Sequence, residues 1–195
     1  MGQEIILASS SPYRRQLLSK LGIRFNYDSP NIDETPYPDE SAEHLVTRLS
    51  IAKAKALAAK YTDHIIIGSD QVCTVNEVIM GKPGNHFTAC HQLQMLSGQR
   101  VKFLTGLAVL NTSNHKLQHC VEPFEVVFRV LSPQLIERYV KADQPFDCAG
   151  SFKSEGKGIV LFKSMRGEDP NSLIGLPLIR LTRFLDMEGI KLLTH

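Results

Sequence analysis

Short apolar runs alternate with amphipathic stretches along the first half of the chain. Residues 5–8 and 64–68 are apolar runs of the length expected for buried strands in an open sheet. Apolar residues at helical spacing predict three helices, over residues 13–21, 41–60 and 87–96. The longest of these helices should bury a stripe made of Leu45, Leu49, Ala52, Ala56 and Ala59. Residues 26–38 are polar and contain prolines, so we expect a loop there.

Strand patterns dominate the second half of the chain. Residues 101–110 and 117–130 predict a long antiparallel ribbon that turns at residues 112–114. The remaining expected elements are a hairpin over residues 72–79 around Asn76 and Glu77, a helix opened by Ser132 and Pro133, a strand over residues 158–162 and a last helix over residues 177–186. The pattern predicts an α/β fold with a mixed, twisted central sheet, flanking helices and two lobes around a cleft.

Length and composition restrict the class of protein without selecting its chemistry. The 195 residues, 43% of them hydrophobic, are enough for one substantial core, so we expect residues 1–195 to form a single domain. A net charge of +2, from 22 basic and 20 acidic residues, indicates no extended surface for a nucleic acid polymer. No leader peptide precedes the first strand, and no apolar run reaches the roughly 18 residues of a membrane span. We therefore expect a cytoplasmic protein without a membrane partner.

The cysteines and histidines show no spacing typical of a zinc site. The four cysteines are widely separated and lack a C-x-x-C pair, so we interpret them as reduced structural thiols. His115 and His119 lie in a predicted strand, where four residues separate them by roughly 13 Å. His86 and Cys90 share this spacing at a helix start, but the sequence indicates no third ligand near them.

The first strand leads through three serines into a helix that begins with Pro12 and contains two arginines. Free N–H groups and the positive end of the helix dipole attract anions at such a helix start, and proline suits the first helical position. Arg14 and Arg15 would add bidentate donors, and Ser9 lies at the end of the strand. This pattern predicts a phosphate site, although an ordinary strand, turn and helix with solvated arginines is the alternative.

Further charged residues gather at predicted strand ends and on one helix. Asp70 and Gln71 follow the second apolar strand, at the position where ligands bind in open α/β sheets. Lys82 follows a glycine a dozen residues later. Lys53 and Lys55 flank opposite edges of the apolar stripe on the long helix, so only one of them can easily reach a central cleft.

Two common nucleotide-binding patterns, G-x-x-x-x-G-K-[ST] and G-x-G-x-x-G, are absent. Five other motifs occur in order: Ser-Ser-Ser-Pro-Tyr-Arg-Arg at residues 9–15, Gly-Ser-Asp-Gln at 68–71, Gly-Lys-Pro at 81–83, Cys-Ala-Gly-Ser-Phe-Lys-Ser-Glu-Gly at 148–156 and Gly-Leu-Pro at 175–177. In content, order and approximate spacing they resemble the Maf family of nucleoside triphosphate pyrophosphatases. The resemblance extends over the whole chain and implies the Maf/ITPase-like form of the predicted fold.

The resemblance also implies roles for the charged residues. The triphosphate of a small-molecule nucleotide would be held by Ser9, Arg14, Arg15, Lys53 and Lys82. Asp70 matches the family's central aspartate, which implies a base that orients or deprotonates the attacking water. Asp70 and Glu34 would hold a divalent cation, Mg²⁺ or Mn²⁺, with Asp33 as the competitor of Glu34. Asp33 and Glu34 could instead only solvate a loop. The products would be the nucleoside monophosphate and pyrophosphate, and we expect a homodimer.

Three residues indicate which base is recognised. The pyrimidine-preferring Maf branch typically has arginine, threonine and glutamine at the positions of Tyr13, Gln71 and Glu155. The residues present here resemble the branch that acts on 7-methylguanosine triphosphate, which implies a house-cleaning role in nucleotide metabolism. A tyrosine face suits this cationic base, and a carboxylate accepts from both donors of its Watson–Crick edge. A dTTP or UTP pyrophosphatase and a nucleotide-binding regulator of cell division without turnover are the alternatives.

Overall fold

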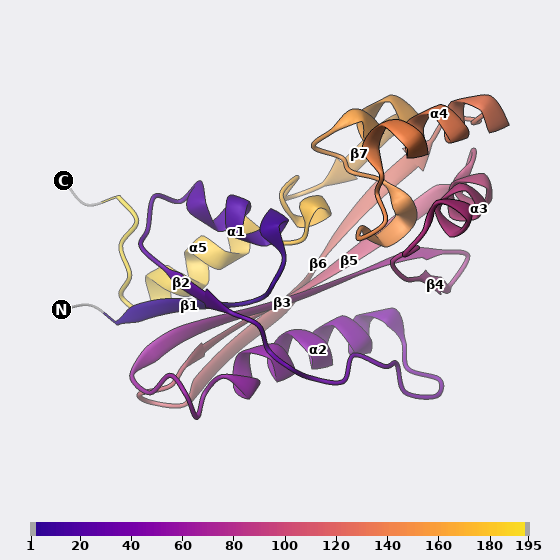
Figure 1. Ribbon diagram of the computed structural model, residues 1–195. Helices are drawn as coiled ribbons and strands as arrows, with labels where there is room; N and C mark the ends of the chain where they lie inside the picture. Colours follow the sequence, from indigo (N-terminus) through magenta and orange to yellow (C-terminus); the bar gives the residue numbers. More distant parts are fainter. Residues whose placement is uncertain (1–2, 194–195) are drawn as a thin grey trace.

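A long, twisted sheet of mixed strand direction runs through the whole molecule (Figure 1). The computed structural model describes residues 3–193. Their strands are β1 (Glu4–Ala8), β2 (Asn26–Asp28), β3 (His64–Val75), β4 (Val78–Met80), β5 (Arg100–Asn111), β6 (Lys116–Phe128) and β7 (Phe162–Gly167). The strand order is β2-β1-β3-β5-β6-β7, with β4 also paired to β3. β1 is parallel to both of its neighbours and the other pairs are antiparallel, which confirms the predicted mixed sheet.

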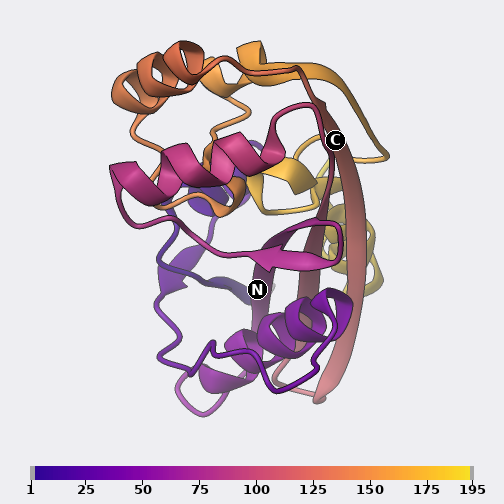
Figure 2. The ribbon, with the colours of Figure 1, turned by 90° about the vertical axis from the view of Figure 1, so that its right-hand side faces the viewer.

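The helices lie on both faces of the sheet and at one end of the long strands (Figures 1 and 2). They are α1 (Pro12–Ser19), α2 (Ala42–Ala56), α3 (His86–Leu96), α4 (Pro133–Asp143) and α5 (Leu178–Met187), with short 3-10 turns η1 (Ala149–Ser151), η2 (Lys157–Leu161) and η3 (Ser172–Ile174). α1 and α5 cover one face of the sheet, α2 covers the other, and α3 packs against α4 at the far end. None of the helices among residues 3–193 is long and apolar enough to cross a membrane.

The two central apolar runs are buried on both faces of the sheet. Ile5 and Leu7 of β1 pack with the leucines of α1 and α5, whereas Ile6 and Ala8 pack against α2. β3 alternates in the same way, with Ile66 on the α2 side. A strand enclosed by helices has no solvent face, which explains why these segments are continuously apolar rather than alternating.

Two glycines allow α2 to lie directly on the sheet. A Cβ at Gly68 would lie 2.1 Å from the Ser50 carbonyl oxygen, and one at Gly106 would lie 2.2 Å from the Val46 carbonyl oxygen. The buried face of α2 therefore includes Ser50 and Lys53.

The predicted buried stripe of α2 is wrong in its second half. Leu45 and Leu49 are buried, as predicted, but Ala52 is only half-buried and Ala56 and Ala59 are exposed. The helix ends at Ala56 instead of residue 60.

Two other expectations from the sequence are wrong. Residues 26–28 are not loop but form β2, because the backbone pairs with the edge of β1 despite the polar side chains. Residues 158–162 are mostly the 3-10 turn η2 rather than a strand. A Cβ at Gly158 would lie 2.4 Å from the Lys153 carbonyl oxygen, so the chain turns tightly there, and pairing with β6 begins only at Phe162.

An aromatic cluster holds the loop that carries η1 against the far end of the sheet. Phe152 makes edge-to-face contacts with Phe103, Phe128 and Phe162, with ring centroids 4.8–5.5 Å apart. Such contacts add to the burial of apolar area. They fix residues 147–155 opposite the start of α1, and the two lobes of the predicted fold meet along this line.

Candidate active site

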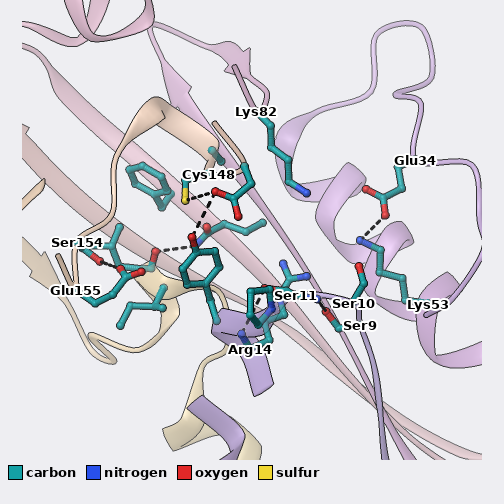
Figure 3. A pocket seen from close by; sticks show the side chains of 18 of the residues that line it. Ser9, Ser10, Ser11, Arg14, Glu34, Lys53, Lys82, Cys148, Ser154 and Glu155 are labelled. Carbon is teal, nitrogen blue, oxygen red and sulfur yellow. Dashed lines mark hydrogen bonds and ion pairs between the residues drawn. The ribbon is translucent and has the colours of Figure 1, made fainter. Parts of the chain in front are cut away.

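A cavity of about 310 Å³ lies between the first strand-to-helix turn and the loop around η1. Figure 3 shows Glu34 and Lys53 on one side of it and Ser154 and Glu155 on the other. The side chains that line it include Ser9, Ser10, Ser11, Tyr13, Arg14, Glu34, Lys53, Gln71, Lys82, Phe103, Asp147, Cys148, Phe152, Ser154 and Glu155. Residues from at least five separate segments thus meet in one place. Four of the five sequence motifs, those at residues 9–15, 68–71, 81–83 and 148–156, contribute to the lining.

Serine hydroxyls accept hydrogen bonds from two N–H groups at the start of α1. The Ser11 hydroxyl caps the helix by accepting from the Arg14 N–H, and Ser9 Oγ accepts from the Ser11 N–H at 3.1 Å. Arg14 Nε donates to the Gly175 carbonyl at 2.8 Å, where the backbone has a φ of +119° that favours glycine. Burial lowers the pKa of Arg14, and the nearby carboxylates of Asp70 and Glu34 oppose that effect.

Lys53 is the centre of a buried charge cluster. Its ammonium lies 2.6 Å from Asp70 Oδ1 and 2.8 Å from Glu34 Oε1, and the side chains of Lys53 and Asp70 are only 6% and 9% exposed. Partial burial by itself would raise the pKa of Glu34, but Lys53, with Lys82 and Arg14 nearby, holds that pKa below its ordinary value. Two carboxylates from distant segments therefore converge on one positive charge.

This donor set fits a hard divalent cation. Asp70 and Glu34 both place an oxygen within hydrogen-bond distance of a single atom, and carboxylate oxygens are the ligands that Mg²⁺ and Mn²⁺ prefer. Mg²⁺ usually takes one or two carboxylates and completes its shell with water and substrate phosphate. Asp33 does not share the cluster, because its Oδ1 accepts from the Thr35 N–H at 2.9 Å within its own loop.

Lys55, Arg15 and Lys82 differ in their position relative to the cavity. Lys55 is exposed, which leaves Lys53 as the lysine of α2 that reaches the cavity. Arg15 does not line the cavity, and its guanidinium stacks 4.3 Å from the ring centroid of Tyr27. Lys82 lies on the exposed loop between β4 and α3, where its side chain lines the cavity. Of the predicted phosphate contacts, Arg15 is therefore separate from the others.

The far end of the cavity is aromatic and acidic. The Tyr13 hydroxyl donates to Asp147 Oδ1 at 3.3 Å, and Lys153 Nζ lies 5.9 Å from the Tyr13 ring centroid. Burial, with Cys148 and Asp147 next to it, raises the pKa of Tyr13, so its hydroxyl remains a donor. Glu155 is exposed at the same end and accepts from the Ser154 hydroxyl.

Sequence reasoning missed Asp147. Asp147 immediately precedes the motif at residues 148–156, and its position beside this motif was the available signal.

Gln71 and Asp169 hold neighbouring loops. The Gln71 amide donates to the Ser172 carbonyl at 2.7 Å and to the Leu173 carbonyl at 3.2 Å, so it fixes η3 while lining the cavity. Asp169 is fully buried and accepts from the N–H groups of Asn171 and Ile179. It shapes the turn and the start of α5.

Away from the cavity, the expectation about His86 and Cys90 is wrong. Glu137 of α4 lies within reach of both, so a third potential ligand is present. It was not visible in the sequence because it follows the pair by 47 residues.

Comparison with known proteins decides the family. The family model described as "Maf-like protein" matches residues 4–188. The chain belongs to the Maf family. This confirms the resemblance seen in the five motifs, which lie within the matched residues.

Curated relatives resemble this Maf chain over nearly their full length. A protein of Alcanivorax borkumensis is 56% identical over 96% of the chain and 95% of its own length. A protein of Pseudomonas aeruginosa is 53% identical over 97% of the chain and 98% of its own length. Both are named 7-methyl-GTP pyrophosphatase.

Two solved structures share the fold of this Maf chain. The Ham1 protein of Staphylococcus aureus matches with a TM-score of 0.54 and 14% identity, over 95% of this chain and 100% of the other. A HAM1 protein of Coxiella burnetii matches with a TM-score of 0.55 and 17% identity, over 95% and 99% of the two chains. At such identities the likeness supports the fold alone, and it agrees with the two-lobed α/β architecture.

Proposed function

We propose that the protein hydrolyses 7-methylguanosine triphosphate to 7-methylguanosine monophosphate and pyrophosphate. The observation that carries the proposal is the division of one cavity into two chemically distinct ends. Lys53, Arg14, Lys82 and Glu34 line one end, where Lys53 also pairs with the buried Asp70. Tyr13 and acidic side chains line the other end. Relatives named for this activity, at 56% and 53% identity, support it.

The phosphate end would bind and polarise the triphosphate. Arg14 and Lys82 would neutralise phosphate oxygens, since both side chains line this end of the cavity. Neutralising these oxygens stabilises the charge that moves onto the leaving pyrophosphate as the bond breaks. Ser9 and Lys53 complete this group of contacts in the proposal.

Asp70 would position the attacking water. Its Oδ1 is held by Lys53 at 2.6 Å, while Oδ2 makes no hydrogen bond to residues 3–193 and is the oxygen we assign to the water proton. The fixed Lys53 contact orients the carboxylate, and a positioned base of this kind typically contributes 10²–10⁴-fold to the rate.

A divalent cation fits the same end of the cavity. Glu34 and Asp70 would hold Mg²⁺ or Mn²⁺ by one carboxylate oxygen each, together with phosphate oxygens of the substrate. When bound, the cation would supply Lewis-acid neutralisation of phosphate charge. Lys53, which contacts both carboxylates in the protein, would add positive charge beside them.

The base end suits a cationic purine. A 7-methylated guanine carries a delocalised positive charge, and the Tyr13 ring offers it a negative face. Asp147 and Glu155 place two carboxylates there against the one ammonium of Lys153, which favours a cation over a neutral base. Glu155 can accept from N1–H and N2–H₂ together, while Gln71 supports the wall through η3.

A substrate panel tests the proposal against both alternatives. Pyrophosphate release should be measured with 7-methyl-GTP, GTP, dTTP and UTP, with Mg²⁺ or Mn²⁺ and with a chelator. We expect 7-methyl-GTP to give the highest kcat/KM and the chelator to abolish turnover. A preference for dTTP or UTP would support the pyrimidine alternative. Absence of turnover with tight nucleotide binding would support the regulator.

Asp70→Asn tests the catalytic assignment. The substitution keeps the shape of the side chain and removes the base, so kcat should fall by at least ~10² while the fold survives. Near-normal turnover would transfer the role to Glu34.

A cytoplasmic location, a single functional domain and a homodimer remain predictions of the sequence. Cell fractionation, limited proteolysis and sedimentation would test them.

A further inference from the structure

A second cluster of ligand-type side chains joins α3 to α4, outside the cavity. His86 is the first residue of α3, and Cys90 follows it one turn later on the same face. Glu137 projects from α4, which packs against α3 (Figures 1 and 2). Cys90 Sγ lies 3.9 Å from the His86 ring nitrogens and 3.6 Å from Glu137 Oε2, and His86 Nε2 lies 3.4 Å from the same oxygen.

These separations are close to those around a tetrahedral zinc ion. With Zn–S near 2.3 Å and Zn–N or Zn–O near 2.0–2.1 Å, tetrahedral angles put neighbouring ligand atoms roughly 3.3–3.6 Å apart. The separations of 3.4 and 3.6 Å lie within this range, and that of 3.9 Å exceeds it by a few tenths of an ångström. We propose that His86, Cys90 and Glu137 bind a Zn²⁺ ion.

The chemistry of the three groups agrees with this assignment. A thiol and an imidazole are ligands for zinc rather than for Mg²⁺, so the cluster differs in kind from the all-oxygen pair of the cavity. Binding would release the Cys90 thiol proton to solvent, and one thiolate, one carboxylate and a neutral imidazole would balance the charge of Zn²⁺. Lys141 pairs with Glu137 Oε1 at 2.9 Å, which leaves Oε2 as the ligand.

The cluster is accessible and leaves room for a fourth ligand. The side chains of His86 and Glu137 are 42% and 44% exposed, so an ion can enter from solvent and keep a water molecule. α3 follows directly on the loop that carries Lys82, and α4 leads into the residues before Asp147. An ion shared by the two helices would therefore brace the loops that carry Lys82 and Asp147, both of which line the cavity.

Zinc binding to the full chain tests the proposal. The protein is stripped with a chelator, and Zn²⁺ alone is titrated in competition with a chromophoric chelator. We expect a site of one ion per chain whose affinity falls by at least ~10-fold in His86→Ala and Cys90→Ala, and also weakens in Glu137→Gln. His91→Ala, exposed on the same helix, and Cys120→Ala are the matched controls and should bind as the unchanged protein does.

Cobalt separates this site from the cavity. Bound Co²⁺ should show a thiolate-to-metal charge-transfer band that persists in Asp70→Asn and disappears in Cys90→Ala. Zn²⁺ should also raise the thermal unfolding midpoint of Asp70→Asn but not that of an Asp70→Asn/Cys90→Ala double variant. Zinc affinity unaffected by both His86→Ala and Cys90→Ala, or a cobalt spectrum without a thiolate band, would overturn the proposal. Loss of the band in Asp70→Asn alone would assign the ion to the cavity instead.

Discussion

Removing the Lys53 ammonium should destabilise the fold more than removing any exposed charge. Lys53→Met keeps most of the buried stem and deletes the group that lies 2.6 Å from Asp70 Oδ1. The Asp70 side chain is 9% exposed, so its carboxylate would be left in the interior without its partner. A buried charge that loses its partner costs about 3–5 kcal/mol.

The second contact of Lys53 adds little to this figure. The Glu34 side chain is 52% exposed and can be solvated when the ammonium is gone, so its share is ~0–1 kcal/mol. The effect should therefore depend on Asp70. In the Lys53→Met/Asp70→Asn double variant no unpaired buried carboxylate remains, so we expect it to recover at least ~2 kcal/mol of the loss relative to the sum of the two single variants.

Urea unfolding of the four proteins measures these free energies, with Lys55→Met as the control because Lys55 is exposed on the same helix. The control should stay within ~0.5 kcal/mol of the unchanged protein. A loss below ~1 kcal/mol for Lys53→Met, or strictly additive single variants, would refute the reasoning that the ion pair neutralises a buried carboxylate.

Three further predictions concern base recognition at the cavity, the buried contacts of Glu188 and the reactivity of Cys148. Glu155→Gln should lower kcat/KM for both GTP and 7-methyl-GTP by an amount equivalent to ~1–3 kcal/mol. Tyr13→Leu should cost ~0.5–2 kcal/mol mainly against the methylated form, as kcat/KM values will show, and equal losses on UTP would exclude this division. Burial would raise the pKa of Glu188, but Lys116 and neighbouring amides hold it below its ordinary value. The resulting stability is present above the unfolded pKa of about 4.3 and is lost as pH falls through the lower folded pKa. Glu188→Gln should therefore unfold ~1–2 kcal/mol more easily at neutral pH, with the difference shrinking in acid and a constant difference contradicting the idea. Burial and the neighbouring carboxylate raise the pKa of Cys148 to about 12. Iodoacetamide at pH 8 should thus modify it at least ~10²-fold more slowly than in urea, as mass spectrometry can follow, and equal rates would contradict that environment.

The sequence by itself determined the elements whose cause is local. Helix starts at Ser11, Ser41 and Ser132 follow from side-chain caps that are visible in the sequence and accept from the backbone three residues later. The turn at Asn76 and Glu77 was also predicted, and both residues adopt positive φ. Continuous apolar runs indicated the strands that are buried on both faces.

Only the tertiary structure decided which side chains share a site. Lys53 rather than Lys55 enters the cavity because α2 sits on Gly68 and Gly106, a contact between distant segments. Glu34 rather than Asp33 joins it because Asp33 is used in its own loop.

The same reason explains the residues that sequence reasoning misplaced or missed. Arg15 turns to Tyr27 of β2, Asp147 is brought to Tyr13, and Glu137 is brought to Cys90 by the packing of α4 on α3. Local propensity acts between residues a few positions apart and is written in their order. Contacts across 47 or 134 positions depend on how whole helices and strands pack, so residue type alone does not specify them.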